Sequence, residues 1–149
     1  MSYKVSKRKE MKSIIQEEPT GCAIASTALL AGVSYKKAKE VANNLGIYAD
    51  DTALWSETGY IRKLLLQFKI GTDKKETAFT DWDSLPDCAL LSIKWHLEKD
   101  KPYWHWVVFV REKNEQFVYD SSTRLKTNIR KDFGRIKPKW FIGVQLKNV

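Results

Sequence analysis

The chain has few of the residues that disulfide scaffolds and metal centres require. Its 149 residues include only two cysteines and two histidines. Cys22 and Cys88 allow at most one disulfide, which excludes a disulfide-stapled fold, and we expect both to be free thiols. A zinc site would need both cysteines together with His96 and His105, but no close cysteine pair is present. We therefore expect neither a metal nor another cofactor.

Long apolar runs are also missing. The longest, 88–93 and 106–110, fall far short of the roughly 20 residues that cross a bilayer. The basic N-terminus leads to an apolar stretch that is much too short for the core of a signal peptide. We therefore expect no membrane span and a cytoplasmic protein. Repeats and Pro/Gly/Ser-rich linkers are absent too, so residues 1–149 are expected to form a single domain, with 1–13 as a flexible basic N-terminus.

Positive charge is concentrated in two stretches. The net charge is +8 at pH 7, and the excess lies in residues 1–13 and 124–139. Such stretches are typical of a solvated surface or of a surface that meets an anionic partner. Residues 124–139 interleave basic and apolar side chains, as nucleic-acid-binding modules do, but no recognition motif accompanies them. A basic nucleic-acid-binding domain is an alternative interpretation, while nucleic acid is not the partner we expect.

The first half of the chain has helical patterns. The run from Cys22 to Ala31 is apolar nearly all round and stops at Gly32, which indicates a buried central helix capped by Thr20 or Gly21. Ser34 then precedes an amphipathic pattern over 35–45, and a third helix is expected over about 57–68.

The second half has strand patterns. β-Branched and aromatic runs separated by charged turns predict strands over 88–95, 104–111, 116–120 and 140–146. Helices followed by antiparallel strands are typical of an α+β domain, with the N-terminal helices packed on a C-terminal antiparallel sheet.

Three side chains suggest nucleophilic chemistry. Cys22 falls in the first turn of the buried helix, where free backbone N–H groups and the helix dipole favour a thiolate. His105 opens one strand and Asp120 ends the next, and an even-numbered connection between them places Asp120 opposite Val107 and on the face of His105. A carboxylate there would orient a general base. We expect that base to be His105 and not His96.

Gln16 precedes the helix by a few residues, at the same end as Cys22. Its amide N–H groups, together with the backbone N–H of Cys22, are suited to donate hydrogen bonds to a developing oxyanion.

These motifs in this order resemble the bacteriocin-processing (double-glycine leader) family of papain-like cysteine peptidases. The resemblance rests on Gln16, Cys22 on an Ala-rich helix, the run from His105 to Val110, and Asp120 after Val-Tyr. It implies a papain-like fold and hydrolysis of a peptide bond in a peptide or protein substrate, of which a leader peptide is one candidate. Cys22 would be the nucleophile, His105 the general base, Asp120 its orienting partner and Gln16 the oxyanion donor.

The chain departs from that family at two places. Members commonly have Asp-Cys-Gly where this chain has Gly21-Cys22-Ala23, and Asp-Pro where it has Asp120-Ser121. No exporter sequence is fused to the domain, so the chain looks like a stand-alone relative. Related folds also serve amidases and acyltransferases, and a binding protein without turnover is a further alternative.

Overall fold

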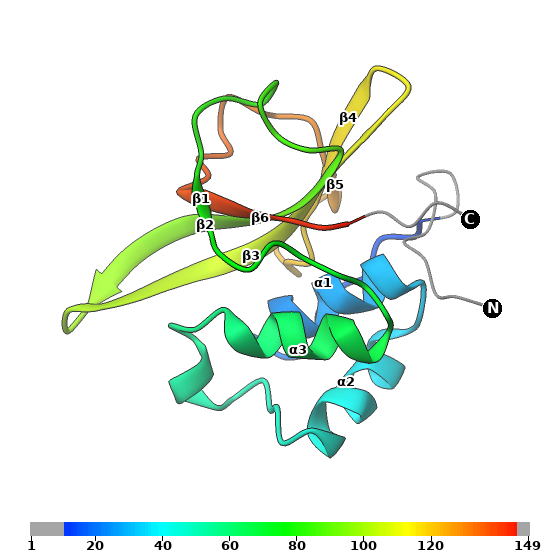
Figure 1. Ribbon diagram of the computed structural model, residues 1–149, viewed down its shortest axis with the longest axis vertical. Helices are drawn as coiled ribbons and strands as arrows, with labels where there is room; N and C mark the ends of the chain where they lie inside the picture. Colours follow the sequence, from blue (N-terminus) through cyan, green and yellow to red (C-terminus); the bar gives the residue numbers. More distant parts are fainter. Residues whose placement is uncertain (1–10, 146–149) are drawn as a thin grey trace.

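Helices and strands occupy separate halves of the chain and separate layers of the molecule (Figure 1). The computed structural model describes residues 11–145. The helical layer contains α1 (Cys22–Ala31), α2 (Tyr35–Asn44), the short 3-10 helix η2 (Thr52–Leu54) and α3 (Gly59–Gln67). The other layer is an antiparallel sheet in the order β1-β6-β2-β3-β4-β5. Its strands are β1 (Thr77–Ala78), β2 (Cys88–Glu98), β3 (Lys101–Glu112), β4 (Glu115–Tyr119), β5 (Ile129–Arg130) and β6 (Trp140–Gly143). The predicted α+β arrangement, with helices packed on an antiparallel sheet, is confirmed.

The central helix α1 begins and ends where the sequence predicts. Every residue after Cys22 in this helix is buried, as its all-round apolar pattern requires. Gly32 ends it in the left-handed conformation, with φ 71°, and its N–H returns to carbonyls of the last turn. The helix is therefore packed on all sides, and this packing fixes the position of its first residue, Cys22.

The other two helices are slightly shorter than expected. Ser34 caps α2 by accepting a hydrogen bond of 3.0 Å from the N–H of Lys37, and the helix ends one residue before the predicted Leu45. In α3, Ile61, Leu64 and Leu65 are fully buried at helical spacing.

The hairpins differ from the predicted ones in the length of their turns. β2 and β3 continue beyond their predicted ends at residues 95 and 104, and only Lys99 and Asp100 connect them. Both have positive φ (51° and 68°), as a two-residue turn requires. Lys113 and Asn114 connect β3 to β4 in the same way. The long β2–β3 hairpin projects at the lower left of Figure 1.

Both faces of the sheet are covered. Trp106 and Val108 of β3 face the helices, whereas Val107 and Phe109 face a second core beneath the loops around Leu85 and Ile136. The expected final strand over 140–146 is observed only as Trp140–Gly143, and residue 146 lies outside the described range.

The N-terminal segment is described only in part. Residues 1–10 of the expected flexible tail lie outside the described range, whereas Met11 is buried in the main core. Within residues 11–145, no helix is long and apolar enough to cross a membrane.

Candidate active site

Strand β4 pairs with only part of β3, and Cys22 lies against the backbone of β3 beyond the end of β4. β4 pairs with β3 from Glu112 only as far as Val108, so Trp106 extends beyond its end. The N-terminus of α1 fills this space, and the N–H of Trp106 donates to Cys22 Sγ at 3.5 Å. The thiol of Cys22 therefore lies beside the strand residue that follows His105.

The structure brings His105 and Asp120 together. Val108 pairs with Tyr119 and Arg111 with Gln116, which is the register of β3 against β4 that the sequence predicts. His105 Nε2 lies 2.7 Å from Asp120 Oδ1. Because Nε2 is bonded to the carboxylate, Nδ1 is the ring nitrogen that is available to exchange a proton with Cys22.

Asp120 is almost fully buried, with 2% of its surface exposed. Besides His105, the N–H of Ser122 donates to Oδ1 at 3.1 Å, and Arg130 Nη1 donates to Oδ2 at 3.1 Å. Burial by itself would raise the pKa of Asp120, but these donors, His105 foremost, outweigh it and lower that pKa. The carboxylate therefore stays ionised in a largely dry position.

The pKa of His105 is raised to about 9. Burial opposes the charged ring, but the hydrogen bonds with Asp120 and Cys22 outweigh that penalty. The ring consequently holds a proton at neutral pH, which it can deliver to a leaving group.

A second charged partner of Asp120 is a residue that the sequence pattern does not single out. Arg130 lies in the two-residue strand β5 and forms a bridge of 3.1 Å to Asp120 and of 2.8 Å to Asp132. The sequence places it among the solvated charges of 124–139. No periodicity marks so short a strand, so only the pairing of β5 with β4 reveals its role.

We expect Arg130→Gln to lower the free energy of unfolding by about 1.5–3 kcal/mol, the range for a hydrogen bond to a charged group. Asp120 would keep His105 and Ser122 as donors but lose the guanidinium of Arg130. Urea unfolding measures the change, and Arg135→Gln, an exposed arginine of the same basic stretch, is the matched control. Equal stability of the two variants would show that the bridge to Asp120 contributes nothing.

Gln16 lies in the turn before α1 and is tied to the segment after β4. Its backbone N–H donates to the carbonyl of Ser121 at 3.0 Å, and its Oε1 accepts from the Ser121 hydroxyl at 2.8 Å. Its Nε2 donates to the carbonyls of Glu18 and Pro19 at 3.0 and 2.8 Å. The side chain is therefore close to the candidate site, but its amide N–H groups are used within its own turn.

Gly21, directly before Cys22, has no room for a side chain. A methyl group there would collide with the hydroxyl of Tyr35. That hydroxyl donates to Glu18 at 2.6 Å and so fastens the turn before α1 to α2. The absence of a side chain at Gly21 therefore leaves room for the hydroxyl of Tyr35.

Two cavities meet at His105. The first, of about 270 Å³, has largely aromatic walls, which are contributed with Cys22 and His105 by Trp55, Tyr60, Tyr103, Trp104 and Trp106. The second, of about 410 Å³, is polar and is lined by Gln16, Lys94 and Arg124 among others. Lys94 lines both cavities from the irregularity in β2 where its φ is 55°. An extended ligand could therefore cross the Cys22–His105 pair from one cavity to the other.

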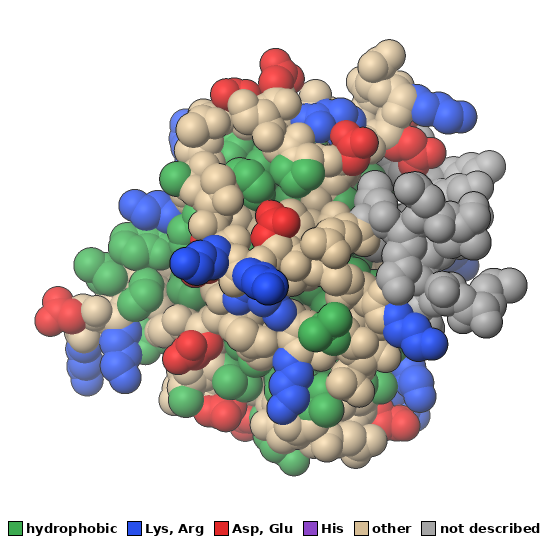
Figure 2. Space-filling model, in the orientation of Figure 1, with side chains coloured by type: hydrophobic (Ala, Val, Ile, Leu, Met, Phe, Trp, Pro, Cys, Tyr) green, Lys and Arg blue, Asp and Glu red, His purple; other side chains and the backbone are tan. Residues whose placement is uncertain are grey.

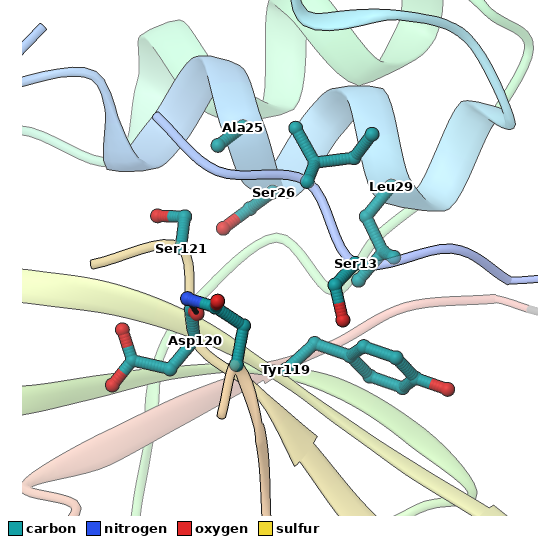
Figure 3. A pocket seen from close by; sticks show the side chains of 9 residues that line it. Ser13, Ala25, Ser26, Leu29, Tyr119, Asp120 and Ser121 are labelled. Atoms are coloured by element: carbon teal, nitrogen blue, oxygen red, sulfur yellow. Dashed lines mark hydrogen bonds between the residues drawn. The ribbon is translucent and has the colours of Figure 1, made fainter. Parts of the chain in front are cut away.

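The helix side of Asp120 is closed. Figure 3 shows Ser26 and Ser121 between α1 and the strand end that carries Asp120. The space there is a cavity of about 10 Å³, which holds one water molecule at most. The two cavities that His105 lines are large enough to give a ligand access to the site.

The second cysteine and the second histidine lie apart from this arrangement. Cys88 is buried in β2, and burial raises its pKa to about 12, so it is an unreactive thiol. His96 is exposed and bonded to Glu98 at 2.7 Å, although it also lines the aromatic cavity. Both cysteines are free, as expected. Among residues 11–145, no group of three or more His, Cys, Asp or Glu residues is placed to hold a metal ion.

On the face seen in Figure 2, the basic residues do not form one continuous patch. Arg130 is directed into the site, as described above. On the face seen in Figure 2, Lys and Arg side chains are interspersed with Asp and Glu. This arrangement does not strengthen the nucleic-acid interpretation, which needs a continuous basic patch.

Comparison with known proteins gives a likeness in fold. No family model matches the chain. No curated protein matches it either. Among solved structures, a double glycine motif protease from an AMS/PCAT transporter, determined in complex with the leader peptide, superposes with a TM-score of 0.59. The two chains are 16% identical, and the superposition covers 97% of this chain and 95% of the other. The chain thus has the fold of this protease domain over nearly its whole length.

Proposed function

We propose that the chain is a papain-like cysteine peptidase that hydrolyses a peptide bond through Cys22, His105 and Asp120. The observation that supports this most directly is the arrangement at the end of β4. There a thiol lies against the strand residue next to a histidine, and that histidine is bonded at 2.7 Å to a buried carboxylate. A nucleophile, a base and an orienting group in this order are what acyl transfer requires.

In the proposed reaction, Cys22 Sγ attacks the carbonyl carbon of the bound peptide as a thiolate. The proton held by His105 passes to the amine that leaves, and a thioester to Cys22 remains. A water molecule, deprotonated by His105, then attacks the thioester and releases the acid and the Cys22 thiolate, while His105 keeps the proton. Asp120 holds the ring orientation throughout, because Nε2 stays bonded to its carboxylate.

The substrate we propose is a peptide, and a leader peptide that ends in a double glycine is the first to test. The likeness to a protease determined with such a leader supports this choice. The test incubates the chain with leader-type peptides and with copies whose Gly-Gly is replaced by bulkier pairs, and locates cleavage by mass spectrometry. Adding an amine acceptor separates hydrolysis from acyl transfer, because a transferase would attach the amine to the product. If every peptide remains intact with wild-type protein, the peptidase proposal is wrong.

We further propose Gln16 as an oxyanion donor, which requires one of its bonds to Glu18 or Pro19 to open when substrate binds. Gln16→Ala should then lower kcat by roughly 10²–10³-fold with little change in KM. Ser121→Ala is the matched control, because it removes the bond to Gln16 Oε1 and leaves the amide N–H groups in place. An equal loss of kcat in both variants would assign Gln16 a purely positioning role.

A further inference from the structure

Tyr60 lies beside the proposed nucleophile and has no part in the triad. It belongs to the first turn of α3 and lines the aromatic cavity together with Cys22. Trp106 connects the two residues. Its backbone N–H donates to Cys22 Sγ at 3.5 Å, and its indole Nε1 donates to the hydroxyl oxygen of Tyr60 at 3.0 Å.

The hydrogen bond from Trp106 determines which further hydrogen bonds the hydroxyl of Tyr60 can form. A phenol has one donor and can accept as well. Here the oxygen accepts from the indole, and no residue within 11–145 accepts the hydroxyl proton, the Cys22 sulfur included. Tyr60 is half-buried and lines the aromatic cavity. Such a donor in the wall of a cavity is therefore available to a ligand.

The hydroxyl also keeps its proton. Burial raises the pKa of Tyr60 above its ordinary range, and the neighbouring Cys22 raises it further. Tyr60 is thus a hydrogen-bond donor at neutral pH. Gln16 differs, because its amide must first release a carbonyl of its own turn.

We propose that Tyr60 is a further catalytic residue, whose hydroxyl donates a hydrogen bond to the carbonyl oxygen of the scissile bond as Cys22 attacks. This inference rests on the proposed function of Cys22. The negative charge that forms on the oxygen strengthens the bond in the transition state, and the indole of Trp106 fixes the hydroxyl in advance. No covalent bond to Tyr60 forms, and its proton stays on the phenol.

The test compares two reactions of Cys22 in Tyr60→Phe, which keeps the ring and removes only the hydroxyl. Acylation by p-nitrophenyl acetate passes through an oxyanion, whereas alkylation by iodoacetamide does not. We expect acylation to slow by about 10²-fold or more, the loss that follows removal of one oxyanion donor. Alkylation of Cys22 should stay within about twofold, which also shows that the site is assembled. Tyr48→Phe, at an exposed tyrosine outside both cavities, is the matched control and should leave both rates unchanged.

Three results would overturn the role of Tyr60. They are an unchanged acylation rate, an equal fall of both rates, and, with a cleaved peptide, a rise in KM without a fall in kcat. The last would mean that the hydroxyl binds the ground state only. A wild-type protein in which neither reagent modifies Cys22 would instead refute the proposed function itself, so the two failures are distinguishable.

Discussion

Replacement of Cys22 by alanine is expected to abolish peptide cleavage, lowering the rate by about 10⁴-fold or more, because removal of the nucleophile leaves only binding and oxyanion stabilisation. Cys88→Ala should retain activity, since Cys88 is buried in β2 away from the cavities. The two variants differ by one thiol each, and each thiol is free in the wild type. Any difference between them therefore reports the position of the thiol and not the number of thiols.

Intact mass after a limiting dose of an epoxide inhibitor of cysteine proteases measures the same difference without a known substrate. We expect one adduct on the wild type and on Cys88→Ala, and none on Cys22→Ala. The raised pKa of Cys88, about 12, keeps it unreactive in all three proteins at neutral pH. An adduct that persists in Cys22→Ala, or labelling of Cys88, would contradict the assignment of the nucleophile.

The second large effect is expected for Asp120→Asn, which should lower kcat by about 10³-fold or more while the fold is retained. The amide oxygen can still accept from Ser122 or Arg130, so its NH2 group turns toward His105 Nε2. His105 then carries its proton on Nδ1, facing Cys22, and can no longer act as the base. Asp132→Asn is the matched control, because Asp132 is an exposed carboxylate that also pairs with Arg130.

The stability of Asp120→Asn should also have a different pH dependence. The pKa of His105 is about 9 in the folded protein and about 6.5 in the unfolded chain, so the stability it contributes is fully present below pH 6.5. That contribution is lost as the pH rises through about 9. In Asp120→Asn the raised pKa loses its main cause, and the decline in unfolding free energy between pH 6.5 and 9 should become smaller. Urea unfolding at several pH values measures it, and an unchanged decline would show that Asp120 does not sustain the charge of His105.

The elements that could be predicted from sequence are those with a periodic pattern and a definite end. Gly32 and Ser34 mark the boundary between α1 and α2, and both occupy the predicted positions. The register of β3 against β4 could be predicted although the turn is shorter than expected. One residue joined each strand, so the parity of the connection, and with it the face of Asp120, was preserved.

The missed features are short or depend on distant contacts. β1 and β5 have two residues each, too few for an alternating pattern. The extension of the β2–β3 hairpin was missed because the charged residues near its tip are typical of a loop. The turn itself consists only of Lys99 and Asp100. Arg130 is brought to the site by the pairing of β5 with β4, and Tyr60 by the packing of α3. No local sequence pattern reveals either contact.

The early end of β4 has a consequence for the order in which the protein becomes active. Cys22 is synthesised well before His105, Asp120 and Arg130, and its contact with β3 lies where β4 has ended. During synthesis the thiol therefore exists for a long time without its base, its carboxylate or the cavities beside it. A nascent chain that has not yet reached Asp120 therefore lacks the complete proposed triad with which to cut its neighbours or itself.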